Sequence, residues 1–193
     1  SRLLEVLTPL TLPDGTTATT HSDITVPGPD VLAFSSDTGT FTSYAGREPV
    51  VVPGLSLGKG PLILGQGAAP VVIGPDMIGP FFQARDFELR LRLRGVANYK
   101  SAGELLRIHT TLLVNVTGRG SLEVLFSTET AEQLKIITSP LALFSPQWHD
   151  IVLGYSATTG LFTITADGHV IGSGMTSGII GPQNSWGLAL GNP

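Results

Sequence analysis

The chain has 193 residues, of which 41% are hydrophobic and 13% charged, with a formal net charge of −4 and no cysteine. This length suits one domain, or one domain with an arm, and a chain of this size buries enough surface to fold without crosslinks. The lack of cysteine excludes disulfides, thiolate metal ligands and a cysteine nucleophile. The negative charge provides no basic field for nucleic acid, and no apolar run reaches the roughly 18 residues that span a bilayer. We therefore expect no nucleic-acid partner and no membrane insertion.

The frequent glycines (24) and prolines (14), combined with little charge, are typical of a β-rich domain. Residues 1–30 are the least regular part, because Pro9 and Pro13 interrupt the apolar positions near the start and break any helix there. We predict an arm or linker over residues 1–30, with at most one edge strand. A single domain over residues 31–193 follows it.

Short strands separated by turns are predicted from residue 31 onward. In chain order they are expected at 31–34, 40–44, 50–52, 62–64, 71–73, 87–94, 104–116, 121–127, 134–138, 148–155, 161–166, 169–171 and 186–190. The run 104–116 is long enough for two strands, with a bend at Thr110 and Thr111. The helix candidate, residues 128–133, is too short to be stable among the neighbouring turns. Roughly a dozen strands are enough for two packed sheets.

The clearest strand is 87–94, where apolar and charged residues alternate. A period of two places the leucines on one face and Arg90, Arg92 and Arg94 on the other. In the segments that follow, charged or polar residues alternate with apolar ones in the same way, notably at Arg107 and Glu123.

If these strands are neighbours, one sheet face carries a group of charged and polar side chains. The candidate ligand-binding residues are Arg90, Arg92, Arg107, His109 and Glu123. Guanidinium groups bind carboxylates and sulfates through paired hydrogen bonds, so this group favours an acidic glycan as the ligand. The alternative is an ordinary solvated sheet face on which the glutamates balance the arginines.

Residues 148–171 are predicted to form three strands in succession. The last two are joined by Asp167-Gly168, the favoured pair for a type I′ hairpin turn, because both central residues need a positive φ. We therefore expect Asp167 to be a turn residue and not a catalytic one.

Together these segments resemble a laminin G-like, concanavalin A-like jelly-roll domain over about residues 30–193. The resemblance rests on the segments 31–37, 71–73, 86–94, 103–108, 120–124, 148–153, 167–171 and 186–192. It implies an all-β fold, a two-sheet antiparallel β-sandwich of the concanavalin A-like jelly-roll type. In that fold Trp148 is expected in the core, and His149 is expected to pack or to face solvent. The family usually adds one more strand after the segment that ends at Asn192. Either this last strand is lacking here or the N-terminal arm takes its place.

The resemblance also implies a function. Most such domains are secreted or extracellular recognition modules that bind sugars, adhesive partners or calcium. We therefore expect a module without catalytic residues, whose partner is a glycan or a protein at the cell surface or in the matrix. Calcium is the cofactor that the resemblance allows, with Asp37, Asp76 and Asp86 as candidate ligands at strand ends or loops.

Two other functions stay open. Some members of the wider fold are polysaccharide lyases or glycosidases. A retaining glycosidase needs two carboxylates about 5–5.5 Å apart, and none of the predicted strands carries such a pair. A lyase could use His109 with Tyr99 or Tyr155 as base and acid. A structural or adhesin module would need only exposed strand edges and the arm.

Overall fold

The computed structural model describes residues 10–11, 17–18, 31–55, 57–60, 62, 64, 69–95, 102–130, 132–141, 147–183 and 186–191. Of the described residues, 48% are in strands and 5% in helix, and the antiparallel sheets that they form do not close into a barrel. The predicted all-β, antiparallel jelly-roll sandwich is confirmed.

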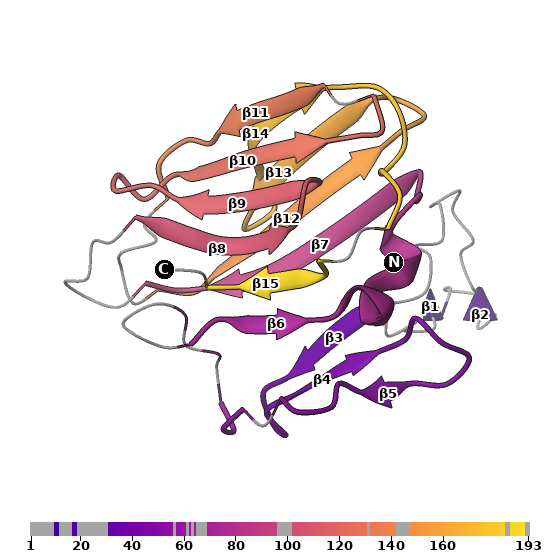
Figure 1. Ribbon diagram of the computed structural model, residues 1–193. Helices are drawn as coiled ribbons and strands as arrows, with labels where there is room; N and C mark the ends of the chain where they lie inside the picture. The colour runs from indigo at the N-terminus through magenta and orange to yellow at the C-terminus, as the bar shows by residue number, and fades with distance from the viewer. Residues whose placement is uncertain are drawn as a thin grey trace.

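Two sheets form the body of the sandwich, and Figure 1 shows the larger one lying over the smaller. The six-stranded sheet has the order β11-β10-β9-β8-β15-β6, with β6 at Val71–Ile73, β8 at Gly103–Ile108, β9 at Leu112–Val116, β10 at Leu122–Ser127, β11 at Gln133–Ile137 and β15 at Leu188–Leu190. The four-stranded sheet has the order β14-β13-β12-β7, with β7 at Asp86–Leu93, β12 at His149–Ser156, β13 at Leu161–Ala166 and β14 at His169–Met175.

Two smaller sheets belong to the N-terminal part. A three-stranded sheet contains β3 (Leu32–Ser35), β4 (Thr40–Ser43) and β5 (Val50–Val51). Within residues 1–30, β1 (Leu10–Thr11) pairs with β2 (Thr17–Ala18), so this region contains two short strands where at most one was expected.

Several local predictions can be compared with the structure. The bend between β8 and β9 is confirmed: Thr110 has a φ of 64° and the Thr111 N–H donates to the Ile108 carbonyl. The 3-10 helix η1 (Pro75–Phe81) was not predicted. Leu62 and Leu64, the described residues of the expected strand 62–64, are not in a strand.

No helix in the described part of the chain is long and apolar enough to cross a membrane.

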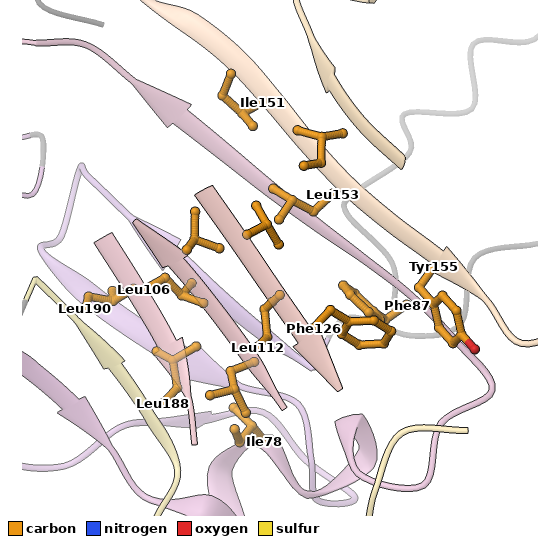
Figure 2. Close-up of a cluster of buried hydrophobic side chains, with 14 of the residues drawn as sticks. Ile78, Phe87, Leu106, Leu112, Phe126, Ile151, Leu153, Tyr155, Leu188 and Leu190 are labelled. Atoms are coloured by element: carbon orange, nitrogen blue, oxygen red, sulfur yellow. The ribbon is translucent and has the colours of Figure 1, made fainter. Parts of the chain in front are cut away.

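The core lies between the inner faces of the two large sheets, and Figure 2 shows its side chains meeting there. Alternation along each strand sends every second residue inward, and each large apolar side chain buried in this way contributes roughly 1.5–3 kcal/mol. Aromatic rings gather around Phe126, whose centroid lies 4.7 Å from that of Tyr155 and 4.9 Å from that of Phe162. The Tyr155 hydroxyl donates to the Gly178 carbonyl at 2.6 Å, and burial raises the pKa of this phenol.

Candidate functional site

The structure separates the five predicted ligand-binding residues onto opposite outer faces of the sandwich. Arg90 and Arg92 lie on β7, whose neighbour is β12, whereas Arg107 on β8 and Glu123 on β10 belong to the six-stranded sheet. His109 follows directly after β8. The prediction that all five share one face is therefore wrong, because the chain crosses from one sheet to the other between β7 and β8.

On the outer face of the six-stranded sheet, the charged side chains neutralise one another. Arg107 Nε lies 3.0 Å from both carboxylate oxygens of Glu104, and Nη2 lies 2.5 Å from Oε2. This hydrogen bonding raises the pKa of Arg107. Glu123 forms an ion pair with Lys135, in which Oε2 and Nζ are 3.4 Å apart. Because each charge is already paired, neither Arg107 nor Glu123 is expected to bind an additional charged ligand strongly.

An exposed aromatic pair lies at the end of the same sheet. The rings of His109 and Trp186 are 5.0 Å apart with an interplanar angle of 32°, and Trp186 is 64% exposed. Beside the turn between β8 and β9, a shallow depression of about 110 Å³ is lined in part by Arg107, Thr110 and Gln133.

On the opposite face, the structure reverses the roles predicted for Trp148 and His149. Trp148 is 36% exposed, so the prediction that it lies in the core is wrong, and His149 is the buried residue at 7%. The reason is strand parity. Ile151, Leu153 and Tyr155 face the interior, so His149, two residues before Ile151, faces the interior too.

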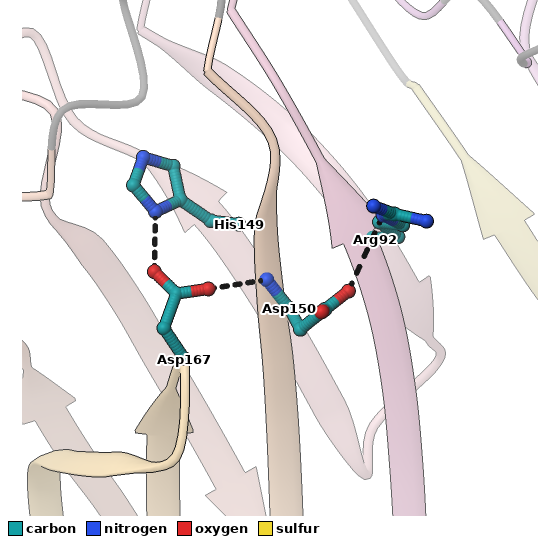
Figure 3. A network of polar contacts seen from close by, with 4 residues as sticks. All are labelled: Arg92, His149, Asp150 and Asp167. Carbon is teal, nitrogen blue, oxygen red and sulfur yellow. Dashed lines mark hydrogen bonds and ion pairs between the residues drawn. The ribbon is translucent and has the colours of Figure 1, made fainter.

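Two guanidinium groups lie against the exposed indole of Trp148. The Arg94 guanidinium carbon is 4.8 Å from the ring centroid and that of Arg92 is 5.8 Å away, both within cation–π range. Arg92 Nε also approaches Asp150 Oδ1 at 3.5 Å, as Figure 3 shows. Both side chains of that ion pair are about 70% exposed, so the pair contributes at most about 1 kcal/mol. The arginines are therefore oriented by the ring while donor groups remain directed to solvent.

Arg90 is placed differently, although it shares this face. Its Nε lies 2.6 Å from Glu88 Oε1 on the same strand. Among the described residues, the guanidinium groups over the Trp148 ring are those of Arg92 and Arg94. The positive charge beside the indole therefore comes from Arg92 and Arg94.

A polar contact between buried His149 and exposed Asp167 connects β12 to the turn between β13 and β14 (Figure 3). His149 Nδ1 lies 2.7 Å from Asp167 Oδ2, and the Asp150 N–H donates to Asp167 Oδ1 at 2.9 Å. The hydrogen bond from His149, followed by that from Asp150, lowers the pKa of Asp167. Because an ionised carboxylate only accepts hydrogen bonds, Nδ1 is the donor.

Asp167 also has the predicted place in the hairpin, since it and Gly168 have φ values of 51° and 81°. Nε2 of His149 is buried without a hydrogen-bond partner in the described part of the chain. Among the described residues, no three histidine, aspartate or glutamate side chains form a group that could hold a metal ion. The pair of His149 and Asp167 is thus a structural contact that orients the ring and holds the turn against β12.

The residues considered for calcium lie on three different elements. Asp37 is in the turn between β3 and β4, Asp76 is in η1, and Asp86 begins β7. The Asp76 carboxylate accepts a hydrogen bond from Gln183 Nε2 at 2.9 Å. The structure therefore does not bring these three aspartates together as one ligand set.

The residues considered for a lyase are also separated. Tyr155 is buried at 3% exposure and donates its hydroxyl proton to Gly178, so it cannot serve as an acid beside His109. Tyr99 lies outside the described residues.

The fold of this chain is similar to that of several solved structures. No family model matches the chain, and no curated protein matches it. The solved binding domain of Paraclostridial Mosquitocidal Protein 1 aligns with 83% of this chain at 15% identity and a TM-score of 0.52. Domains LG4-5 of the mouse laminin α1 chain align with 66% at 18% identity and a TM-score of 0.47. A SAP-like pentraxin from Limulus polyphemus aligns with 54% at 19% identity and a TM-score of 0.38.

These alignments cover 39%, 32% and 50% of the three solved chains, so this chain spans half of their length or less. At such identities the likeness concerns the fold and not the activity. The resemblance to laminin G-like and concanavalin A-like sandwiches is confirmed at that level.

Proposed function

We propose that this chain is a non-catalytic recognition module that binds an anionic carbohydrate chain on the outer face of its four-stranded sheet. The observation that carries the proposal is the exposed indole of Trp148 with the guanidinium groups of Arg92 and Arg94 against it. The similar domain of the mosquitocidal protein is a binding domain, which supports a binding module of this fold.

The chemistry of this cluster favours a sugar acid or a sulfated sugar. An indole presents a flat apolar surface against which the C–H face of a pyranose ring can pack. A guanidinium beside it offers a planar fork of donors that fits a carboxylate or sulfate. One ligand residue can therefore contact Trp148 with its ring and Arg94 with its charged group. Because such chains occur at cell surfaces and in the matrix, we place the module outside the cell.

Of the five ligand-binding residues predicted from the sequence, only Arg92 belongs to the proposed site. Trp148 and Arg94 are its other members. Arg90 is engaged by Glu88 and is left outside the site. Arg107, His109 and Glu123 lie on the other sheet, so a chain bound at Trp148 does not reach them on that face.

Binding can be measured by tryptophan fluorescence, because the chain has only two tryptophans. A sulfated oligosaccharide and an oligouronate are titrated at low salt, where charge-assisted contacts are least screened. We expect Trp148→Ala, which lacks the reporter and is therefore followed by titration calorimetry, to abolish binding, and Arg94→Ala to weaken binding by about tenfold, the loss of one charge-assisted hydrogen bond. Trp186→Ala and Arg119→Ala are the matched controls, since both residues are exposed and lie away from the cluster.

Three outcomes would contradict the proposal. The first is that neither oligosaccharide binds at low salt. The second is that Trp186→Ala weakens binding as much as Trp148→Ala does. The third is that the wild-type chain releases new reducing ends or unsaturated uronates, which would assign the protein to the polysaccharide-degrading enzymes of this fold.

A further inference from the structure

The stacked rings of His109 and Trp186, which we call the aromatic platform, lie at one end of the six-stranded sheet. Their centroids are 5.0 Å apart, and Trp186 is 64% exposed. The backbone next to this indole is held in place, because a Cβ at Gly187 would collide with the carbonyl oxygen of Ile73 on β6. The platform is therefore preorganised, and much of the indole is in contact with water.

The shallow depression of about 110 Å³ adjoins the platform, since Thr110 in its lining directly follows the platform histidine. The lining includes Leu113 and Leu125, which are half-buried cross-strand neighbours on β9 and β10. Its polar residues include Thr110, Ser127 and Gln133. Apolar contact combined with a few polar groups in a concave surface is typical of sites for small molecules.

The charged side chains of this sheet are balanced by one another. Its six strands carry four of them, which are Glu104, Arg107, Glu123 and Lys135. They form two ion pairs, Arg107 with Glu104 and Lys135 with Glu123, and so add no net charge. Arg107 bonds to Glu104 through Nε and Nη2, which are two of the three guanidinium nitrogens. The strands therefore offer a ligand both donors and acceptors but no net charge.

We propose that this end of the six-stranded sheet is a second binding site, and that its ligand is an uncharged saccharide. The C–H face of a sugar ring packs against the Trp186 indole, and the hydroxyl groups bind the polar residues of the depression. A hydroxyl group both donates and accepts hydrogen bonds, so it is matched by a surface that offers both. An anionic sugar would instead have to displace Glu104 from Arg107. This site goes beyond the proposed function, because it lies on the other sheet and selects a different class of ligand.

A second copy of this chain, or another protein, fits this face less well. The exposed apolar side chains of its strands, Val72 and Ile137, lie on β6 and β11, at opposite ends of the strand order. The ion pairs lie on the same face, where the side chains of Arg107 and Lys135 are 40% and 54% exposed. A protein surface covering them would remove their water, and the desolvation penalty can exceed the gain. The hydroxyl groups of a saccharide can take the place of that water.

The test uses the full chain with Trp148→Ala, in which Trp186 is the only tryptophan. Cellohexaose, mannohexaose and chitohexaose are the uncharged probes, and a sulfated oligosaccharide of the same length is the matched charged probe. We expect at least one uncharged probe to change the Trp186 fluorescence, with a Kd of about 1 mM or lower. Because no net charge takes part, this Kd should change by less than about twofold between low and high salt.

Variants are compared by titration calorimetry with the uncharged probe that binds. We expect Trp186→Ala to weaken binding at least about tenfold, and Trp186→Tyr to retain it within about threefold because an aromatic ring remains. Gln133→Ala should weaken binding by about fivefold, the loss of one hydrogen bond. Arg94→Ala and Arg119→Ala are the matched controls and should leave the affinity unchanged, since both residues are exposed and lie outside this site. If circular dichroism shows that Trp186→Ala disturbs folding, Gln133→Ala at an exposed position tests the depression by itself.

Three outcomes would overturn this proposal. One is that none of the uncharged probes binds, and another is that Trp186 responds to the sulfated probe alone. The third is a chain that dimerises in sedimentation experiments and becomes monomeric with Trp186→Ala, which would assign this face to a second copy. Each of them leaves the site at Trp148 standing, because that site is measured with anionic sugars in a chain that retains Trp148.

Discussion

The two sides of the sandwich are closed in different ways. On one side β14 packs against β11, and a Cβ on Gly172 would lie only 2.9 Å from Cγ2 of Ile136. On the other side β7 has arginines outside and leucines inside, and the leucines stay partly exposed. Small residues such as Gly172 allow two strands to approach closely, so that the strands themselves exclude water from the core. Large side chains on an end strand such as β7 keep part of their apolar surface exposed. Among the described residues, the β14 side is therefore closed by direct packing of two strands, whereas the leucines of β7 remain partly exposed.

The largest expected effect compares two leucines that face each other across β7 and β12. Leu153 is fully buried and its cross-strand neighbour Leu89 is only partly so. We expect Leu153→Ala to lower the free energy of unfolding by about 2–5 kcal/mol, and Leu89→Ala by roughly half as much, because less surface and packing are lost. Guanidinium unfolding of both variants measures this. Equal losses would mean that the β7 side is as enclosed as the rest of the core.

A smaller effect is expected at the closed side. Gly172→Val should lower the free energy of unfolding by about 1–3 kcal/mol, because the new side chain is forced against Ile136 and Thr138. Gly154→Val is the matched control, since a Cβ at Gly154 meets nothing closer than Thr163 Oγ1 at 3.5 Å. The control should change stability by no more than about 0.5 kcal/mol. If urea unfolding gave the two variants equal stability, the close approach of β14 and β11 would not be what seals this side.

The smallest effect concerns the polar contact between β12 and the turn that leads into β14. The native pKa of Asp167 lies below its ordinary value of 3.8, so its carboxylate stabilises the fold above that pH and loses this contribution as pH falls through the native pKa. Asp167→Asn keeps a residue that tolerates a positive φ in the turn and removes the charge. We expect Asp167→Asn to have a lower Tm than the wild-type chain at neutral pH, and this difference in Tm to disappear below the native pKa of Asp167. Circular dichroism measures both Tm values. Asp37→Asn, in an exposed turn, is the control. A Tm difference that persists unchanged at strongly acidic pH would assign the effect to the turn and not to the charge.

Much of the local structure could be predicted from the sequence. Alternation identified β7 and β10, and the pair Asp167 and Gly168 identified the hairpin turn. The orientation of Trp148 could also have been found, because the parity of Ile151 and Leu153 on the same strand already directs it outward. The family resemblance led instead to the wrong face.

The candidate site was predictable only in part. Arg92 was identified from its place on a charged strand face, and Trp148 became a partner only once its side of β12 was known. The cation–π contacts join residues that are more than 50 positions apart in the printed sequence, and nothing in the spacing of either strand indicates that they meet.

By itself, the sequence determined which residues of each strand share a face, because side chains alternate along any extended backbone. Only the tertiary structure decided which strands became neighbours, because pairing depends on where the chain crosses between sheets and on which cores fit together. That decision placed Arg90 and Arg92 on one outer face and Arg107 and Glu123 on the other. Among the described residues, it also made β7 the end strand of the four-stranded sheet, with partly buried leucines on its inner face.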